Sequence, residues 1–242
     1  MERRLSLINH MELRDLVPAK LDTVIVPIGT IEAHGVIPLG TDMLIPDRLA
    51  ERLCTEIDAL VAPSIPYGIT RGLYGHPGTV FITPGVFRSY VTDVLASLAR
   101  TGFEKIVVIN GHGGQIAELQ DALFEASKTS NVKALLINWW LGMEDLCKEK
   151  LAREGGHAGA DETAAIMAID ASLVKRELYD ENMTVRQAPY FKAYPFPGAI
   201  ITYAEGDGRL NFDEAACCAY FDAVVARLGA AVRDILARWD QI

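Results

Sequence analysis

The chain has 242 residues and a formal net charge of −9, and 50% of its residues are hydrophobic and 23% charged. This length suits one large α/β domain, or two small ones at most, and the composition is that of an ordinary globular protein. The acidic balance argues against nucleic acid as a partner, because phosphate binding requires a basic face.

The start of the chain is charged and has no apolar signal core, so we expect a cytoplasmic protein. No stretch approaches the roughly 20 consecutive apolar residues of a membrane span, and we expect no membrane association. The four cysteines form no Cys-x-x-Cys pair and are interpreted as free thiols. They are Cys54, Cys147, Cys217 and Cys218.

Apolar runs alternate with amphipathic stretches along the chain. Strands are expected at Thr23–Ile28, Leu60–Ile65, Ile106–Asn110 and Ala134–Asn138. Helices are expected at Pro46–Asp58, Val86–Thr101, Gln115–Thr129, Asp161–Ile169 and Phe212–Trp239. The strands are continuously apolar, which is typical of a parallel sheet covered on both faces by helices. The predicted fold is therefore a three-layer α/β/α sandwich with a mostly parallel sheet, formed by residues 1–242 as a single domain.

Polar side chains follow the first predicted strand. Glu32, His34 and Asp42 lie within eleven residues of one another. Glu32 and His34 are spaced i, i+2, so they point to the same side if the backbone is extended. Carboxylates and imidazoles are ligands of divalent metals. The alternative is a surface loop with an isolated histidine.

A glycine-rich loop, INGHGGQ at 109–115, follows the third predicted strand. It could cradle a phosphate at a helix N-terminus, but it lacks the P-loop lysine and the GxGxxG spacing. A second interpretation is that the glycines bring the backbone close to a site and aim His112 into it. The third is a tight turn with a capping histidine.

The segment GGHAGADET at 155–163 places His157, Asp161 and Glu162 at the start of a predicted helix. Both acids could simply favour the first helical turn, or Glu162 could point inward. The three segments together deliver histidines and acids to the edge of the sheet where ligands bind in open α/β folds. Crowded carboxylates repel one another unless cations offset them, so the combination predicts a metal site.

These motifs together resemble the creatininase (creatinine amidohydrolase) family. The resemblance is carried by PIGTIEAHGVIPLGTD, YGHPGT, VVINGHGGQ and HAGADET and covers about residues 20–165. It implies a three-layer α/β/α fold and a hydrolytic site with two divalent metal ions of Zn, Mn or Fe. It also implies a homo-oligomer, commonly a hexamer.

The resemblance also implies roles for individual residues. Glu32 and His112 would bind one metal, His34 the other, and Asp42 would bridge the two. His157 would match the proton-transfer histidine, helped by a pKa near neutrality. Glu162 would be a metal ligand or a catalytic acid.

Two departures from the family pattern argue against creatinine as the substrate. The usual Glu-x-His-Gly-Pro-His-Leu-Pro loop is one residue shorter here, because Val36-Ile37-Pro38 follows Gly35. True creatininases also carry a glutamate ligand where this chain has Gly114. The second metal would then take Glu162 or a water as its ligand.

The expected reaction is hydrolysis of a C–N bond in a small amide, cyclic amide or formamide by a metal-activated water. Asn110 or the backbone N–H groups of Gly113-Gly114 would steady the oxyanion, although Asn110 could equally be a structural cap. Trp139 or Trp140 would wall the pocket, with at least one of them in the core.

Three alternatives to this reaction stay open. They are hydrolysis of a keto-inositol ring, a metal-stabilised binding protein without turnover, and nucleotide binding by the Gly111–Gly114 loop. The irregular segment Asp180–Leu210 would form a lid, a binding loop or a subunit contact through Phe191, Tyr194 and Phe196.

Overall fold

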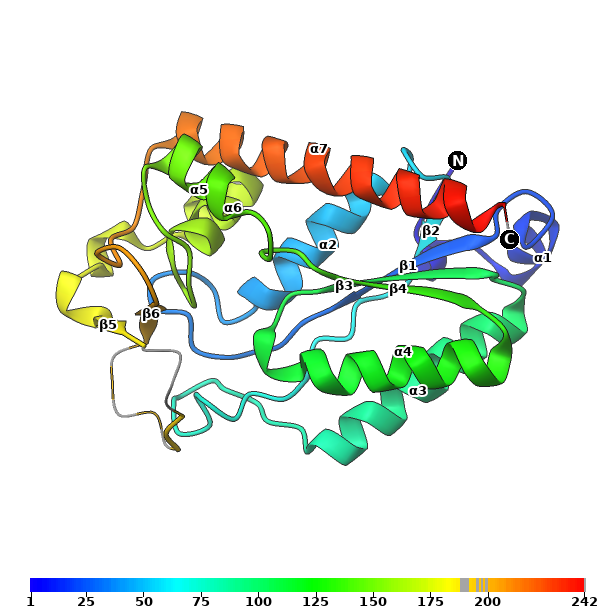
Figure 1. The fold of residues 1–242 in the computed structure, drawn as a ribbon, viewed down its shortest axis with the longest axis horizontal. Helices are drawn as coiled ribbons and strands as arrows, with labels where there is room; N and C mark the ends of the chain where they lie inside the picture. The colour runs from blue at the N-terminus through cyan, green and yellow to red at the C-terminus, as the bar shows by residue number, and fades with distance from the viewer. Residues whose placement is uncertain (188–191, 195, 197, 199, 242) are drawn as a thin grey trace.

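The computed structural model describes residues 1–187, 192–194, 196, 198 and 200–241. At its centre lies a parallel four-stranded sheet with strand order β2-β1-β3-β4 (Figure 1). Its strands are β1 (Thr23–Ile28), β2 (Ala59–Val61), β3 (Lys105–Asn110) and β4 (Lys133–Asn138). All six residues of β1 and of β3 are buried, so these two strands are covered on both faces, as their continuous apolar sequence predicts.

Helices cover both faces of the sheet, which confirms the predicted three layers (Figure 1). One face carries α2 (Thr41–Leu53), α5 (Glu144–Leu151), α6 (Ala160–Asp170) and α7 (Glu214–Trp239). The other carries α1 (His10–Leu16), α3 (Pro84–Thr101) and α4 (Ile116–Ser130). Each face of the sheet has its own hydrophobic core, and successive strand residues point into opposite cores. Ile25 packs with the first set of helices and Val24 with the second.

Two helices were not predicted from the sequence. The short α1 begins with a capping box in which Asn9 and Glu12 bond each other's backbone N–H groups. Helix α5 spans only Glu144–Leu151. Five single turns of 3-10 helix also occur among the described residues, at Leu5–Leu7, Gly113–Gln115, Ala171–Leu173, Arg176–Leu178 and Glu181–Met183.

The prediction that a helix begins at Pro46 was wrong. Helix α2 begins at Thr41 and ends at Leu53, with Pro46 inside it. A proline affects the carbonyl four residues before it, here that of Asp42, so the turn that precedes Pro46 can still be helical. The earlier start matters because it places Asp42 in the first turn of α2 instead of in a loop.

The segment predicted to be irregular contains a second, two-stranded parallel sheet. Its strands are β5 (Thr184–Arg186) and β6 (Ile201–Tyr203). Phe191, one of the three aromatic residues expected in a lid, lies outside the described residues, whereas Tyr194 and Phe196 are described.

Helix α7 is 26 residues long and apolar enough, by length and composition alone, to cross a membrane. Its packing accounts for this character, because residues such as Cys217, Tyr220 and Val224 are fully buried in the hydrophobic core that α5 and α6 share. It is therefore placed as a core helix over one face of the sheet.

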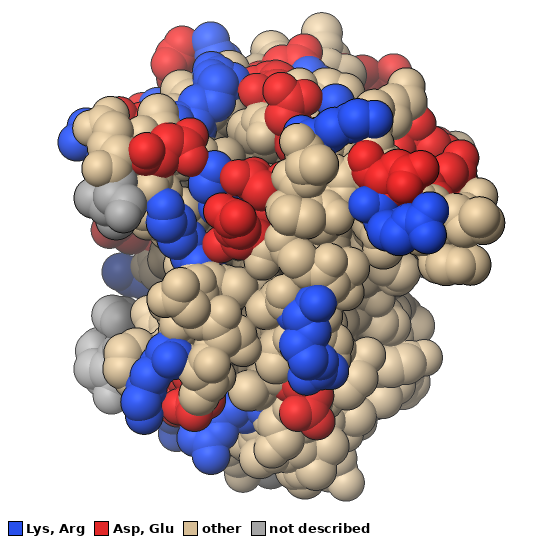
Figure 2. All heavy atoms as spheres, turned by 90° about the vertical axis from the view of Figure 1, so that its right-hand side faces the viewer, with Lys and Arg blue, Asp and Glu red and all other residues tan. Residues whose placement is uncertain are grey.

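The strand order places a topological switch point between β1 and β3. The connection from β1 runs through α2 on one face, and the connection from β3 runs through α4 on the other. The crevice beyond the carboxyl ends of such strands is where open α/β sheets bind ligands. The opposite end of the molecule carries both chain termini and shows acidic and basic side chains interspersed (Figure 2).

Candidate metal centre

Three segments meet beyond the carboxyl ends of β1 and β3. The loop after β1 leads through Glu32 and His34 to Asp42, and these three residues are each 1% exposed. His112 follows β3, and Glu162 lies in the first turn of α6. The structure therefore brings together all the residues that the sequence proposed as metal ligands.

Asp42 lies between two histidines, with one carboxylate oxygen directed to each. Its Oδ1 is 2.9 Å from His34 Nε2, and its Oδ2 is 3.0 Å from His112 Nδ1. The hydroxyl of Thr30 donates a hydrogen bond of 2.6 Å to Oδ2. This arrangement is the one required of a carboxylate that bridges two cations.

Each of the three site histidines has one ring nitrogen close to a backbone carbonyl oxygen. His34 Nδ1 is 3.0 Å from Glu32 O, His112 Nε2 is 3.0 Å from Ile69 O, and His157 Nε2 is 2.9 Å from Ala33 O. A carbonyl can only accept, so each of these nitrogens carries the proton. The other nitrogen of each ring is left facing the carboxylates, which is the orientation of metal-binding histidines.

The donor atoms fall into groups that fit divalent metal ions. Glu32, Asp42 and His112 form one group, and His34, Asp42 and Glu162 form another, each with its donor atoms within 4.8 Å of one another. Glu32, His34 and His157 form a third such group. The first two groups share Asp42.

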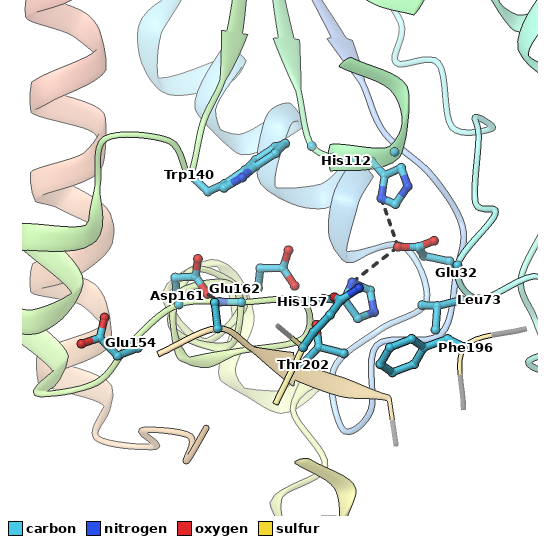
Figure 3. A pocket seen from close by; sticks show the side chains of 18 of the residues that line it. Glu32, Leu73, His112, Trp140, Glu154, His157, Asp161, Glu162, Phe196 and Thr202 are labelled. Carbon is cyan, nitrogen blue, oxygen red and sulfur yellow. Dashed lines mark hydrogen bonds and ion pairs between the residues drawn. The ribbon is translucent and has the colours of Figure 1, made fainter. Parts of the chain in front are cut away.

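One further observation supports a cation beside Glu32. Its Oε1 is buried and has no hydrogen-bond donor among the described residues. The oxygen lies 3.1 Å from His112 Nδ1 and 3.5 Å from His157 Nδ1, distances of ion pairs without hydrogen-bond geometry (Figure 3). A buried carboxylate oxygen without a donor is costly unless a cation satisfies it, so the residues fit a metal ion.

The pKa shifts of the buried groups indicate an excess of negative charge at the centre. Burial alone would lower the pKa of His34, but Asp42, Glu162 and Glu32 raise it to about 10. Glu32 and Asp42 likewise outweigh burial and raise the pKa of His112 well above its ordinary value. Burial raises the pKa of Glu162. Protons on the histidines thus offset the buried acids, and a divalent ion could take their place with release of protons.

His157 differs from the other two histidines. Burial and then the charge of His34 lower the pKa of His157 to about 4. The expectation of a pKa near neutrality was therefore wrong, because it ignored both the burial of the ring and its contact with His34, whose ring centre is 4.4 Å away. The ring is held neutral, with Nδ1 free to accept a proton.

Glycines let the backbone pass close to Asp42. A Cβ atom on Gly29 would lie 2.2 Å from the carbonyl oxygen of Asp42, and one on Gly111 would lie 1.8 Å from the same atom. The ends of β1 and β3 thus clamp the start of α2 from two sides. In contrast, a Cβ on Gly113 would meet Trp140 at an ordinary contact distance of 3.7 Å.

Gly114, the position of a glutamate ligand in true creatininases, has no room for a side chain. A Cβ there would lie 2.5 Å from His112 Nε2 and 2.6 Å from Ile69 O. Glu162 supplies the carboxylate on the other side, with its Oε2 3.7 Å from His34 Nε2 and bonded at 2.6 Å by the N–H of Ala158. The carboxylate that true creatininases take from the position of Gly114 is thus missing here, and Glu162 supplies a carboxylate from α6.

A cavity of about 720 Å³ opens above these groups. Glu32, His112, His157 and Glu162 line it, together with Gly113 and Trp140 (Figure 3). Strand β6 closes one side through Thr202, whose N–H donates to the carbonyl of His157 at 2.9 Å. The volume suits a small molecule.

Two of the four residues predicted to bind substrate do not line this cavity. Trp139 is fully buried in the core, so Trp140 is the tryptophan at the wall. Asn110 is also fully buried and bonds the backbone of His112 through both its oxygen and its nitrogen. Asn110 is therefore the structural cap that the sequence left open as its alternative role.

Sequence reasoning missed several residues of the site. Thr30, whose hydroxyl donates to Asp42, could have been noticed as a hydroxyl two residues after the end of β1. Cys147 and Tyr220 line the cavity from α5 and α7, but nothing in the local sequence signals this position, because only the packing of these helices against α6 creates it.

Comparison with known proteins agrees with the geometry. The family model for creatininase, creatinine amidohydrolase, matches residues 6–232. The 3-dehydro-scyllo-inosose hydrolase of Thermotoga maritima is 32% identical over 167 residues, which are 64% of this chain and 53% of that protein. This chain thus covers only about half the length of that relative.

Two further matches cover more of the chain. The mycofactocin precursor peptide peptidase of Mycolicibacterium smegmatis is 27% identical over 237 residues, which are 94% of this chain and 88% of that protein. A solved creatininase variant of the Zn-Zn type has a TM-score of 0.83 at 20% identity, covering 97% of this chain and 98% of that one. The structural likeness shows a shared α/β fold, and the family model covers nearly the whole sequence. The chain belongs to the creatininase (creatinine amidohydrolase) family.

Proposed function

We propose that this chain is a metal-dependent hydrolase that cleaves a C–N bond in a small amide, cyclic amide or formamide. The observation that carries the proposal is the pair of donor groups that share Asp42 beneath a cavity of about 720 Å³. Neither a nucleotide site nor a purely structural metal would require a further histidine, His157, at the cavity wall beside Glu32. The whole chain is taken as one hydrolase domain.

The proposed cofactor is a pair of divalent ions of Zn, Mn or Fe. Glu32 and His112 would hold one ion, His34 and Glu162 the other, and Asp42 both. Such a pair ionises a water molecule at neutral pH and polarises a carbonyl oxygen. Glu162 is assigned as a ligand instead of a catalytic acid because it completes a donor group with His34 and Asp42.

The remaining chemistry falls to His157. Its Nε2 proton is held by the carbonyl of Ala33, which leaves Nδ1 to accept a proton from the attacking water. The same nitrogen then returns this proton to the leaving nitrogen as the C–N bond breaks. The backbone N–H of Gly113 and the ring of Trp140 would position the substrate, since both residues line the cavity.

The test is elemental analysis combined with a substrate screen. About two equivalents of Zn, Mn or Fe per chain are expected, together with turnover of at least one cyclic amide or formamide. Metal without turnover of any compound in the screen would favour the binding-protein alternative. Absence of metal after refeeding would refute the proposal.

The screen includes keto-inositols, because the relative from Thermotoga maritima is named as a hydrolase of 3-dehydro-scyllo-inosose. Turnover of a keto-inositol and of no amide would move the proposal from C–N to C–C or C–O bond cleavage at the same centre.

His157→Gln separates chemistry from metal binding. We expect turnover to fall roughly 100-fold or more, in the range of lost general acid–base catalysis, with metal content unchanged. Metal analysis and the rate constant are measured on the same sample. A variant that loses metal in proportion to activity would instead make His157 a ligand, as its group with Glu32 and His34 allows.

We also infer a cytoplasmic homo-oligomer, such as a hexamer, that acts on small molecules and binds neither nucleic acid nor membranes. Exposed aromatic residues support the oligomer, among them Tyr67, Tyr74 and Tyr90, whose side chains are about half or more exposed. Light scattering at micromolar concentration should give a multiple of 26.5 kDa. A mass of one chain would contradict the oligomer.

A further inference from the structure

The cavity has a second functional wall, remote from Glu32 and His112. It is built by α5, α6 and α7 from Glu144, Asp161 and Tyr220, which we call the acid wall. Asp161 lies across the cavity from Glu32 and His112 (Figure 3). Asp161 is 7% exposed and Tyr220 is fully buried, so both are fixed parts of the fold.

Tyr220 brings an unsatisfied hydroxyl to this wall. Its oxygen has no hydrogen-bond partner among the described residues, although the side chain lines the cavity. Asp161 lines the same cavity, and burial and then the charge of Asp161 raise the pKa of Tyr220. A buried hydroxyl without a partner is unfavourable in itself and is satisfied when a ligand supplies one.

The carboxylates of the acid wall are not paired with a cation in the described part of the chain, although Lys148, Lys192 and Arg71 also line the cavity. Within the described part of the chain, neither Asp161 nor Glu144 forms an ion pair, and Asp161 Oδ1 accepts only the N–H of Gly156 at 3.0 Å. The nearby cation, Lys148, already pairs with Glu154 at 3.2 Å. Burial and then the nearby acids Asp161, Glu154 and Glu144 raise the pKa of the Cys147 thiol to about 12.

The acid wall is separate from the metal centre although Asp161 and Glu162 are neighbours. Successive residues of a helix point about 100° apart. Glu162 turns to His34, whereas Asp161 turns to Gly155, where a Cβ atom would lie 2.5 Å from Asp161 Oδ2. Asp161 and Glu162 therefore present their carboxylates to different neighbours.

We propose that the acid wall selects substrates that carry a positively charged nitrogen with N–H donors, such as an ammonium or amidinium group, at the end remote from the scissile bond. This inference rests on the proposed hydrolase function. A carboxylate and a phenol oxygen both accept from N–H groups, and the indole of Trp140 offers a face for a cation. A carboxylate or phosphate at this end of the substrate would be repelled.

The test uses three small probes of nearly the same shape: acetamidinium, acetamide and acetate. Ligand-observed NMR titration of the metal-loaded protein at constant ionic strength gives an apparent Kd for each. We expect acetamidinium to bind roughly 10- to 100-fold more weakly to Asp161→Asn, in line with a lost charge-assisted hydrogen bond. Tyr220→Phe is expected to weaken binding about 3- to 10-fold. Acetamide should bind these variants as it binds the unaltered chain, whereas acetate, which Asp161 would repel, should bind Asp161→Asn more tightly than the unaltered chain.

Matched controls exclude general effects. Tyr179→Phe removes another hydroxyl that lacks a partner among the described residues, but Tyr179 does not line the cavity. Glu149→Gln removes an exposed charge from α5, the helix that carries Glu144. Neither control should alter acetamidinium binding. Metal content, measured for each variant, should stay at the unaltered level.

The outcomes are distinguishable from those of the hydrolase test. Unchanged acetamidinium binding in both Asp161→Asn and Tyr220→Phe would overturn the acid-wall proposal, and so would acetamide binding that weakens equally. The binding titration does not require turnover. A chain that binds acetamidinium through Asp161 but hydrolyses nothing would contradict the hydrolase and leave the cation pocket in place.

Discussion

Asp42→Ala is expected to abolish both metal binding and turnover. Asp42 gives one carboxylate oxygen to the side of His34 and the other to the side of His112, so its loss removes a donor from both metal groups. Each group would keep two protein donors, too few for a stable site in which three are usual. Metal content should fall from about two equivalents to near zero.

The matched control for this variant is Asp47→Ala. Asp47 lies on the same helix and is half-buried, but it bonds Ser64 at 3.3 Å and belongs to neither metal group. Its variant should keep full metal content. If Asp42→Ala retains one equivalent, Asp42 serves a single ion and the bridging assignment is wrong. If it retains both, Asp42 is not a ligand.

Gly111→Ala is expected to disrupt the centre without changing any ligand. The added Cβ would lie 1.8 Å from the carbonyl oxygen of Asp42 and 2.9 Å from Pro46 Cγ, and a helix backbone cannot yield to this extent cheaply. Overpacking of this kind costs roughly 1–3 kcal/mol or more, which would lower Tm by about 3–10 °C in a domain of this size. The shift of Asp42 should also lower metal content.

Gly113→Ala is the control, two residues along the same loop. Its Cβ would meet only Trp140 at 3.7 Å, so its Tm and metal content should match those of the unaltered chain. Thermal unfolding of both variants, with and without added metal, checks the prediction. Equal behaviour of the two variants would show that the clamp on Asp42 does not govern metal binding.

The meeting of the candidate metal ligands was largely predictable because most of them follow strand ends. In a parallel sheet the carboxyl ends of β1 and β3 lie at one edge, so the polar residues after them must meet there. The residue types then indicate a metal. The start of α2 was mispredicted because Pro46 was interpreted as a first-turn residue, although the donor role of Asp42 did not depend on that boundary.

The cavity wall was not predictable in the same way. Tyr220 lies 58 residues after Glu162 in the sequence, and its place in the cavity depends on how α7 packs against α6. The sequence also could not say which of the two tryptophans faces the cavity, since adjacent tryptophans look alike until the chain turn after β4 sends Trp139 into the core and leaves Trp140 at the wall. The pKa of His157 likewise depends on burial, which only the fold reveals.

The hydrogen bond from the N–H of Thr202 to the carbonyl of His157 joins β6, which closes one side of the cavity, to the backbone of His157. Gly156 fits tightly beneath the same strand, since a Cβ there would lie 2.0 Å from Thr202 O. Any outward swing of β6 large enough to break this contact also releases the backbone that aims the histidine. The position of the His157 backbone and the closure of the cavity by β6 therefore depend on the same contact.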